Sequence, residues 1–424
     1  MVELMRPCAE KTTEMAVISL LVVLAAISSA PAWAIDYSAS GFLSLSAGKI
    51  NHDDVEFLDL NSTLSFDNDT IIGGQLSVQF SDRFSVTGQV IARGFALDRS
   101  NNYQPTLDWL YLTYDMSPEL RLRIGRLATP YYSVSEYFEI GAAYPWVRPP
   151  LDVYEPAMSP IKNFNGLDLV FRSNWKDWFF LSQFFAGLEK NETDIYDINI
   201  HHITGVSFNA TKNYFSIRLA TLIASVSLDI FDARSTLSLL RGLNSPSESQ
   251  TQAVSKVIEI LESNRIKHQY SSIGINWDNE TWFVFSEYNR LSSGEGFTPD
   301  GEGIYVTLGY RLKKWTYYFT RGDIKSLLGQ ELKDFAVGEL IPSDEAVVSI
   351  IGGQALSIAS NNRRYQRTYA LGLRYDISNS MALKFEAQAV TPERQSVGLI
   401  TLKDEAVYQA PKIKVYSLVL DWVF

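Results

Sequence analysis

The chain is poor in cysteine and histidine, and it lacks a long apolar run. Its 424 residues include one Cys and four His. A single thiol supports neither an internal disulfide nor a site built from several thiolates. A membrane-spanning helix needs about 20 consecutive apolar residues, whereas the longest apolar stretch, 16–27, is shorter and the mean hydropathy is -0.05. These absences exclude a disulfide-stapled domain and a helical membrane protein.

The stretch 16–27 has the surroundings of a secretory signal. Arg6 and Lys11 precede it, and Ala32-Trp33-Ala34 follows it. A charged segment, an apolar segment and an A-x-A site are the parts of a cleavable signal peptide. We expect residues 1–34 to be removed with Cys8, which leaves 35–424 as one exported domain.

Basic residues are in deficit. Lys and Arg number 37 against 48 Asp and Glu, giving a net charge of -11. The chain also contains no run of basic residues. A nucleic-acid partner is therefore not expected.

What the chain does have is a repeated alternation of apolar and polar residues. Membrane-spanning β-strands alternate in this way over about 10 residues, because one face meets lipid and the other meets the lumen. Many segments agree, the clearest being 75–80, 120–124, 167–172, 215–220, 304–312, 371–376 and 383–388. The strands of a soluble β-sandwich would show the same alternation. The lengths of the connections must therefore distinguish the two folds.

The connections alternate between short and long. Short turns are expected at 81–83, 117–119, 174–177, 211–213, 278–280, 313–314 and 378–380. Long connections are expected at 49–69, 96–106, 127–163, 189–199, 226–267, 291–300, 323–363 and 391–411. This sidedness is typical of an outer-membrane barrel with short periplasmic turns and long external loops. The sequence predicts an all-β fold, a transmembrane antiparallel barrel of about 16 strands.

Tryptophan supports the same fold. Six residues lie beside a predicted short turn or the C-terminus: Trp175, Trp178, Trp277, Trp282, Trp315 and Trp422. Aromatic rings gather at membrane interfaces. We therefore expect a periplasmic girdle of tryptophan.

Two of the long connections, 226–267 and 323–363, contain helical patterns. In 249–264 apolar residues recur at helical spacing, and Ser249 with Gln252 predicts a capping box. The second pattern, 343–358, is weakened by Gly352-Gly353. We expect both pieces to cap the mouth of the barrel, and a partner-binding helix is the alternative.

The C-terminus carries a resemblance to known proteins. Its alternate residues form one apolar face that ends at the last position: Tyr416, Leu418, Leu420, Trp422 and Phe424. This face resembles the terminal strand of Gram-negative outer-membrane proteins. The resemblance implies recognition by the barrel-assembly machinery.

The first half of the chain resembles the Gram-negative porin superfamily. Gly41-Phe42-Leu43-Ser44-Leu45 is similar to a porin first strand, and 125–132 is similar to the end of the fifth strand. The resemblance implies a bacterial outer-membrane location and a third loop, 127–163, that folds into the lumen. The second half matches no motif beyond its strand pattern.

The predicted inward loop is charged. It carries Glu136, Glu139, Asp152 and Glu155 against Arg148 and Lys162. On the wall, seven arginines fall on the lumen-facing parity of their strands: Arg93, Arg121, Arg123, Arg172, Arg218, Arg311 and Arg374. One reading is that these arginines reflect only the polar inner face of any barrel and pair with nearby Asp or Glu. The other is that they face the loop carboxylates across a pore constriction. Charge rings of the second kind set channel selectivity.

These features predict a porin for passive diffusion of small hydrophilic solutes and ions, with weak cation preference. A substrate-specific channel and a surface-binding or adhesion platform are the alternatives. Outer-membrane lipid and lipopolysaccharide are expected partners, and an apolar outer wall leaves monomer and homotrimer open.

No cofactor, metal or enzymatic activity is expected. The one candidate catalytic cluster joins His201-His202 to Asp194 or Asp197, and adjacent residues of a strand point to opposite faces.

Overall fold

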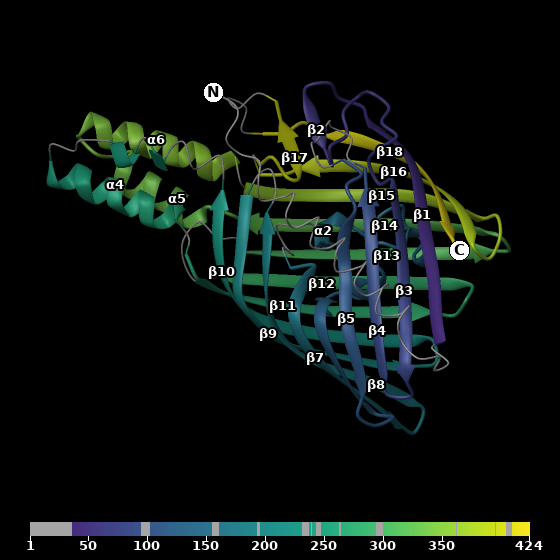
Figure 1. The fold of residues 1–424 in the computed structure, drawn as a ribbon. Helices are drawn as coiled ribbons and strands as arrows, with labels where there is room; N and C mark the ends of the chain where they lie inside the picture. Colours follow the sequence, from purple (N-terminus) through teal and green to yellow (C-terminus); the bar gives the residue numbers. More distant parts are fainter. Residues whose placement is uncertain are drawn as a thin grey trace.

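The segments with alternating apolar and polar residues form the strands of a closed barrel (Figure 1). The computed structural model describes residues 36–94, 102–154, 161–192, 196–230, 237–238, 240–242, 247–262, 264–293, 300–361, 363–394, 396–403 and 409–424. The predicted signal segment 1–34 lies outside these residues. None of the described helices combines the length and apolarity needed to cross a bilayer.

Sixteen strands close the barrel, and every neighbouring pair is antiparallel. Their order follows the chain, so the predicted fold class is confirmed. The strands are β1 (Asp36–Ile50), β3 (Ile71–Ser81), β4 (Phe84–Arg93), β5 (Thr106–Asp115), β6 (Leu120–Ala128), β7 (Asn163–Trp175), β8 (Trp178–Glu192), β9 (Tyr196–Lys212), β10 (Phe215–Ile230), β11 (Ile266–Asp278), β12 (Trp282–Ser293), β13 (Gly301–Leu312), β14 (Trp315–Leu327), β15 (Arg363–Asp376), β16 (Met381–Pro392) and β18 (Ile413–Val423).

The last strand closes the barrel on the first. Leu45 pairs with Leu420, and the Phe424 carbonyl accepts a 2.7 Å hydrogen bond from the Gly41 amide. The predicted C-terminal face points outward, with Leu418 44% and Phe424 59% exposed. An apolar face of this kind on a closed barrel suits lipid and not water.

The seven predicted short turns join consecutive strands at one end of the barrel, and the tryptophans gather there. Trp175 and Trp178 flank one turn, Trp277 and Trp282 flank another, and Trp315 opens β14. The connections at the other end are less uniform than expected. The segment 189–199 is not a long loop, because β8 runs to Glu192 and β9 begins at Tyr196, whereas seven residues, 294–300, separate β12 from β13.

A small sheet at the long-loop end was missed by the sequence analysis. β2 (Val55–Phe57) pairs with β17 (Ile400–Leu402), so the first and last external connections meet. Phe57 and Ile400 are buried with Ile50 and Ile413 in one cluster. Three-residue strands give no periodicity to detect.

The helical connections form one bundle that projects away from the barrel and does not fold across its mouth (Figure 1). It contains α4 (Glu248–Leu261), α5 (Gln330–Phe335), the π-helical turn η3 (Ala336–Leu340) and α6 (Ala346–Asn361), which share a buried apolar cluster. The expected position over the mouth is therefore wrong.

Two details of the helices also differ from expectation. Ser247 caps α4 by accepting the Gln250 amide at 3.2 Å, so the capping box at Ser249 and Gln252 is wrong. α6 runs through Gly352-Gly353 without a break. A Cβ at Gly352 would meet the Leu340 side chain, so glycine permits the close packing of α6 on η3.

Candidate functional site

The connection between β6 and β7 enters the barrel, as predicted for the third loop. It contains two 3₁₀ turns, η1 (Ser135–Tyr137) and η2 (Gly141–Ala143), and the single helical turn α2 (Leu151–Tyr154). Trp146 is 3% and Val153 0% exposed. We call the described part of this connection, 129–154 with 161–162, the inner loop.

Hydrogen bonds attach the inner loop to the inward faces of β11–β13. Trp146 Nε1 donates to Thr307 Oγ1 at 3.0 Å, and the Tyr131 hydroxyl donates to the Ser271 carbonyl at 3.0 Å. Rings of the loop also pack on wall aromatics, as Trp146 does on Phe285 at a centroid distance of 5.7 Å. The loop therefore has the packing of a protein core on this side.

Basic residues of β15 and β16 hold the loop backbone. Lys384 is 0% exposed and its Nζ donates to the carbonyls of Gly141 and Trp146, while it pairs with Asp421 at 2.9 Å. Arg374 Nη1 donates to the carbonyls of Ala142 and Tyr144. Buried carbonyls need such donors, so these cations satisfy loop groups that water cannot reach. The alternation in the sequence correctly predicted that Arg374 faces the lumen. Lys384 was not among the predicted site residues.

Glycines in β13 and β14 let α2 touch the wall. A Cβ at Gly303 would collide with the Asp152 carbonyl, and one at Gly322 with its carboxylate. Asp152 is 2% exposed and accepts a 3.0 Å hydrogen bond from Thr368 Oγ1. Burial raises the pKa of Asp152 to about 7. Asp152 is thus a docking residue and not, as expected, a charge facing a pore.

A second external connection reaches the loop. Arg148 Nε donates to both Asp69 carboxylate oxygens at 3.1 Å, and its Nη2 donates to Ser417 Oγ at 2.9 Å. Arg148 is 7% exposed, so this predicted pore charge is buried and paired. The sequence could not show this partner, because it lies 79 residues earlier.

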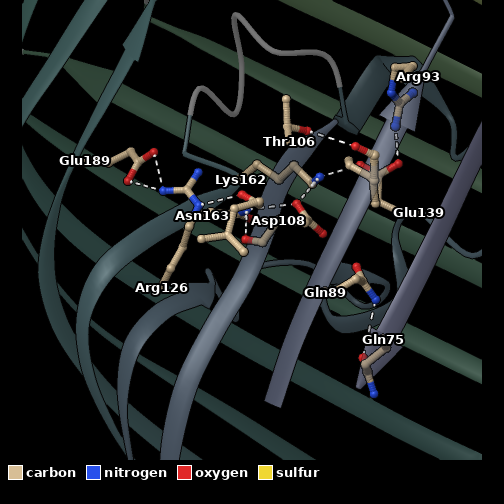
Figure 2. A network of polar contacts seen from close by, with 12 residues as sticks. Gln75, Gln89, Arg93, Thr106, Asp108, Arg126, Glu139, Lys162, Asn163 and Glu189 are labelled. Carbon is tan, nitrogen blue, oxygen red and sulfur yellow. Dashed lines mark hydrogen bonds and ion pairs between the residues drawn. The ribbon is translucent and has the colours of Figure 1, made fainter. Parts of the chain in front are cut away.

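On the opposite side, one carboxylate ties the loop to β4 and β5 (Figure 2). Glu139 pairs with Arg93 and Lys162, and Lys162 Nζ donates to Asp108 at 2.8 Å. Burial opposes ionisation of Glu139, but Arg93 and Lys162 outweigh it and leave its pKa below the ordinary value. Glu139 is 6% exposed, so its charge is also neutralised locally.

Among the predicted loop acids that the structure describes, Glu136 stays in contact with solvent. Its side chain is 54% exposed, and its Oε1 lies 3.6 Å from Arg123 Nη2. Arg123 also pairs with Asp168, and Arg121 pairs with Asp115 at 2.6 Å. The loop carboxylate therefore faces a ladder of wall arginines on β6 and β7.

The seven wall arginines have separate roles. Arg93, Arg123, Arg218 and Arg374 contact the inner loop. Arg311 pairs with Asp278 at 2.6 Å, away from the loop. Arg172 belongs to the ladder near Glu136 and Arg121. Glu155 lies outside the described residues, so the structure does not place it.

The histidine pair has no catalytic surroundings among the described residues. His201 Nε2 lies 2.9 Å from Ser227 Oγ, which donates onward to Asn264. Asp194 lies outside the described residues. No group of three or more His, Cys, Asp or Glu in the described part of the chain could hold a metal ion.

Comparison with known proteins gives the fold but no close relative. No protein-family model and no curated protein matches the chain. Among solved structures it is similar to an anion-selective porin from Comamonas acidovorans, with 10% identity, a TM-score of 0.54 and coverage of 92% of this chain and 100% of that one. It is also similar to the outer membrane channel DcaP of Acinetobacter baumannii, with 10% identity, a TM-score of 0.51 and coverage of 92% of this chain and 97% of that one. A third similar structure is a loop-deletion mutant of OmpT, an outer membrane protein of Vibrio cholerae, with 8% identity, a TM-score of 0.53 and coverage of 92% of this chain and 100% of that one. The chain therefore has a fold similar to that of outer-membrane porin barrels.

Proposed function

We propose that this barrel is a channel for the diffusion of small hydrophilic solutes and ions, narrowed by the inner loop. The observation that carries the proposal is Glu136, a solvent-exposed carboxylate that faces the arginines of β6 and β7. Opposed charges across a lumen orient water and favour polar over apolar solutes. A merely structural ion pair would be expected to bury Glu136, as Glu139 is buried.

The charges around Glu136 favour weak anion selectivity. Three arginines oppose two carboxylates that reach solvent there: Arg121, Arg123 and Arg172 against Glu136 and Asp115, since Asp168 is 0% exposed and Arg218 also faces the buried Glu287. The cation preference expected from sequence assumed four loop acids in the pore. Glu139 and Asp152 are buried, so that assumption is wrong for these two.

A planar bilayer tests this proposal. We expect the wild-type barrel to conduct, with a small reversal potential of the anion-selective sign in a KCl gradient. Glu136→Gln should increase the anion preference, because it removes the exposed carboxylate. Glu139→Gln is the comparison, and it should change selectivity less because its charge is buried between two cations. Absence of conductance by the wild-type barrel would contradict the proposal that it is a channel.

The alternative of a surface-binding platform has one observation in its favour. The helical bundle exposes apolar residues well away from the lipid-facing wall, with Ile350 62% and Val337 50% exposed. Conductance separates the two functions, since a platform does not need an open lumen. A substrate-specific channel would instead conduct and be blocked saturably by one solute.

The C-terminal face supports an assembly role in addition to its lipid contact. Phe424 packs over Gly41, where a Cβ would collide with its ring. We propose that this strand is read by the barrel-assembly machinery. Deleting Phe424 should lower the yield of folded barrel in the outer membrane, and an unchanged yield would contradict the assignment.

A further inference from the structure

A hollow of about 680 Å³ lies where the helical bundle meets the external rim of the wall. The external ends of β8, β9 and β10 form one side, and Leu237 and Arg241 with the end of α4 form the other. We call it the rim hollow. Small-molecule sites occupy about 300–1,000 Å³, so the rim hollow has the size of such a site and is too large for a single ion.

The rim hollow lies on the outer side of the wall and not in the lumen. Lys190 is the cross-strand partner of Asn199, which in turn pairs with Ser227, so the three side chains share one face. Their neighbours along the strands, Ile200 and Val226, are buried in the cluster that contains the inner-loop residues. The hollow is therefore separate from the passage proposed above and does not depend on it.

The hollow also lies above the lipid tails. On β10 the outward row is apolar and exposed at Leu219 and Ile223, and it becomes polar at Ser225 and Ser227. A strand rises about 3.3 Å per residue, and a tilt of about 40° lowers this to about 2.5 Å along the membrane normal. Ser227 is then about 30 Å above Phe215 at the periplasmic turn, whereas the apolar band is about 25 Å tall. Dissolved molecules can therefore reach the hollow.

Both sides of the rim hollow are held by contacts of their own. On the wall side Ser227 Oγ donates to Asn264 Oδ1 at 2.7 Å and accepts from the Arg265 amide at 3.0 Å. On the bundle side Arg241 pairs with Glu262. A site with fixed sides needs little ordering when a ligand binds, and this favours affinity.

The described lining presents one base and one acid on each side. Lys190 and Asp229 belong to the wall, and Arg241 and Glu262 belong to the bundle. These four charges cancel, so a ligand with a net charge would leave part of this lining without a complement. A molecule that carries both an ammonium and a carboxylate can form charge-assisted hydrogen bonds with both kinds of residue.

Apolar surface completes the rim hollow. Leu228, Leu237 and Leu261 line it, and aliphatic groups of a ligand can pack there. None of the described lining residues is an aromatic ring on which the face of a sugar could stack. A hollow of this volume is about 9 Å across, which two or three extended residues span at about 3.5 Å each.

We propose that the rim hollow binds a short peptide of two or three residues in its zwitterionic form. The peptide carboxylate pairs with the basic residues of the lining, and its ammonium pairs with the acidic residues. Its backbone groups meet Asn199 and Asn264, whose side-chain amides both donate and accept hydrogen bonds. Its side chains pack on the three leucines.

Isothermal titration calorimetry of the whole detergent-solubilised barrel tests this site, with trialanine that has free termini as the probe. The double variant combines Lys190→Gln and Asp229→Asn, which leaves the net charge unchanged. We expect its affinity to fall about twentyfold, since each exposed ion pair contributes up to about fivefold. Lys190→Gln alone should lose about fivefold. This single variant keeps the test valid if the double variant fails to fold.

A matched control makes the same two changes in an exposed pair at the periplasmic turns, through Lys212→Gln and Asp177→Asn, whose Nζ and Oδ2 atoms lie 3.3 Å apart. It should bind trialanine as the wild type does. An equal loss in the control, or unchanged affinity in the double variant, would overturn the proposal.

Two further probes test the chemistry of the ligand. Trialanine with acetylated and amidated ends, and the disaccharide sucrose, should each bind about tenfold less tightly than free trialanine. Equal binding of the blocked peptide would show that the end charges are not recognised, and equal binding of sucrose would mean a sugar site. Either result would overturn the proposal, as would a wild-type Kd for trialanine above about 10 mM.

Discussion

The two halves of the inner wall meet the loop differently. On β10–β18 the loop is buried against the wall, and Lys384, Thr307 and Val153 are each 0% exposed. On β3–β9 the contacts are ionic, and Glu136 and Lys162 have side chains that are 54% and 41% exposed. We call these the packed half and the polar half.

The difference shows how one loop combines a rigid, buried side with a side that keeps charges in contact with solvent. Buried donors and close glycine contacts fix the backbone on the packed half. Charges on the polar half are left facing solvent, where they would act on ions in the proposed channel. If permeation occurs, it follows the polar half.

The largest expected effect comes from Lys384→Met in the packed half. It leaves Asp421 buried without its cation, and breaking a buried pair costs about 3–5 kcal/mol. Arg121→Met in the polar half removes a partly exposed pair, which contributes at most about 1 kcal/mol. Chemical denaturation of the two folded barrels gives both free energies of unfolding. Equal losses would remove the distinction between the halves.

Adding Asp421→Leu to Lys384→Met sharpens the result. The second change removes the stranded carboxylate, so much of the stability should return. Absence of any recovery would show that the loop carbonyls, and not the ion pair, dominate this site.

Gly303→Ala should have the next largest effect. Its Cβ would collide with the Asp152 backbone, and such overpacking costs about 1–3 kcal/mol. Single-channel current should also become noisier as the loop is displaced. Gly74→Ala is the control, because no atom lies within 4 Å of a Cβ there. Similar losses from both substitutions would contradict close docking at Gly303.

Asp152 should make the stability of the packed half depend on pH. Its pKa of about 7 lies above the ordinary 3.8, so the folded chain binds this proton more tightly than the unfolded chain. The stabilisation is complete below about pH 4 and is lost as pH rises through 7. The wild type should lose on the order of 2 kcal/mol more than Asp152→Asn between pH 5 and pH 8. Parallel pH profiles would show that Asp152 is not buried in this way.

The wall could be predicted from sequence because it depends on local patterns. Alternation fixes which face of a strand meets lipid, and turn length fixes the sidedness, so Arg374 and Trp315 were placed correctly. A charged residue in the loop has no such constraint. Glu139 is buried because Arg93 and Lys162 pair with it, whereas Glu136 stays in contact with solvent. The sequence does not show which of the two acids these cations reach.

The same limit applies to the outer parts of the fold. The β2–β17 pairing joins segments more than 300 residues apart through three-residue strands. Gly352-Gly353 suggested a weak helix, because the sequence does not show that η3 packs against it. Lys384 fell on the inward parity, but its two carbonyl partners are set only by the folded loop.

The central claim is that the polar half, and not the packed half, lines the passage. Residues 35–424 contain no cysteine, so a single introduced thiol reports its own surroundings. We compare Glu136→Cys with Thr307→Cys, which is 0% exposed beneath Trp146. Each channel is recorded in a planar bilayer while a bulky charged methanethiosulfonate reagent is added. The account predicts a stepwise fall in conductance for Glu136→Cys and none for Thr307→Cys. Block of Thr307→Cys with Glu136→Cys unaffected would contradict it.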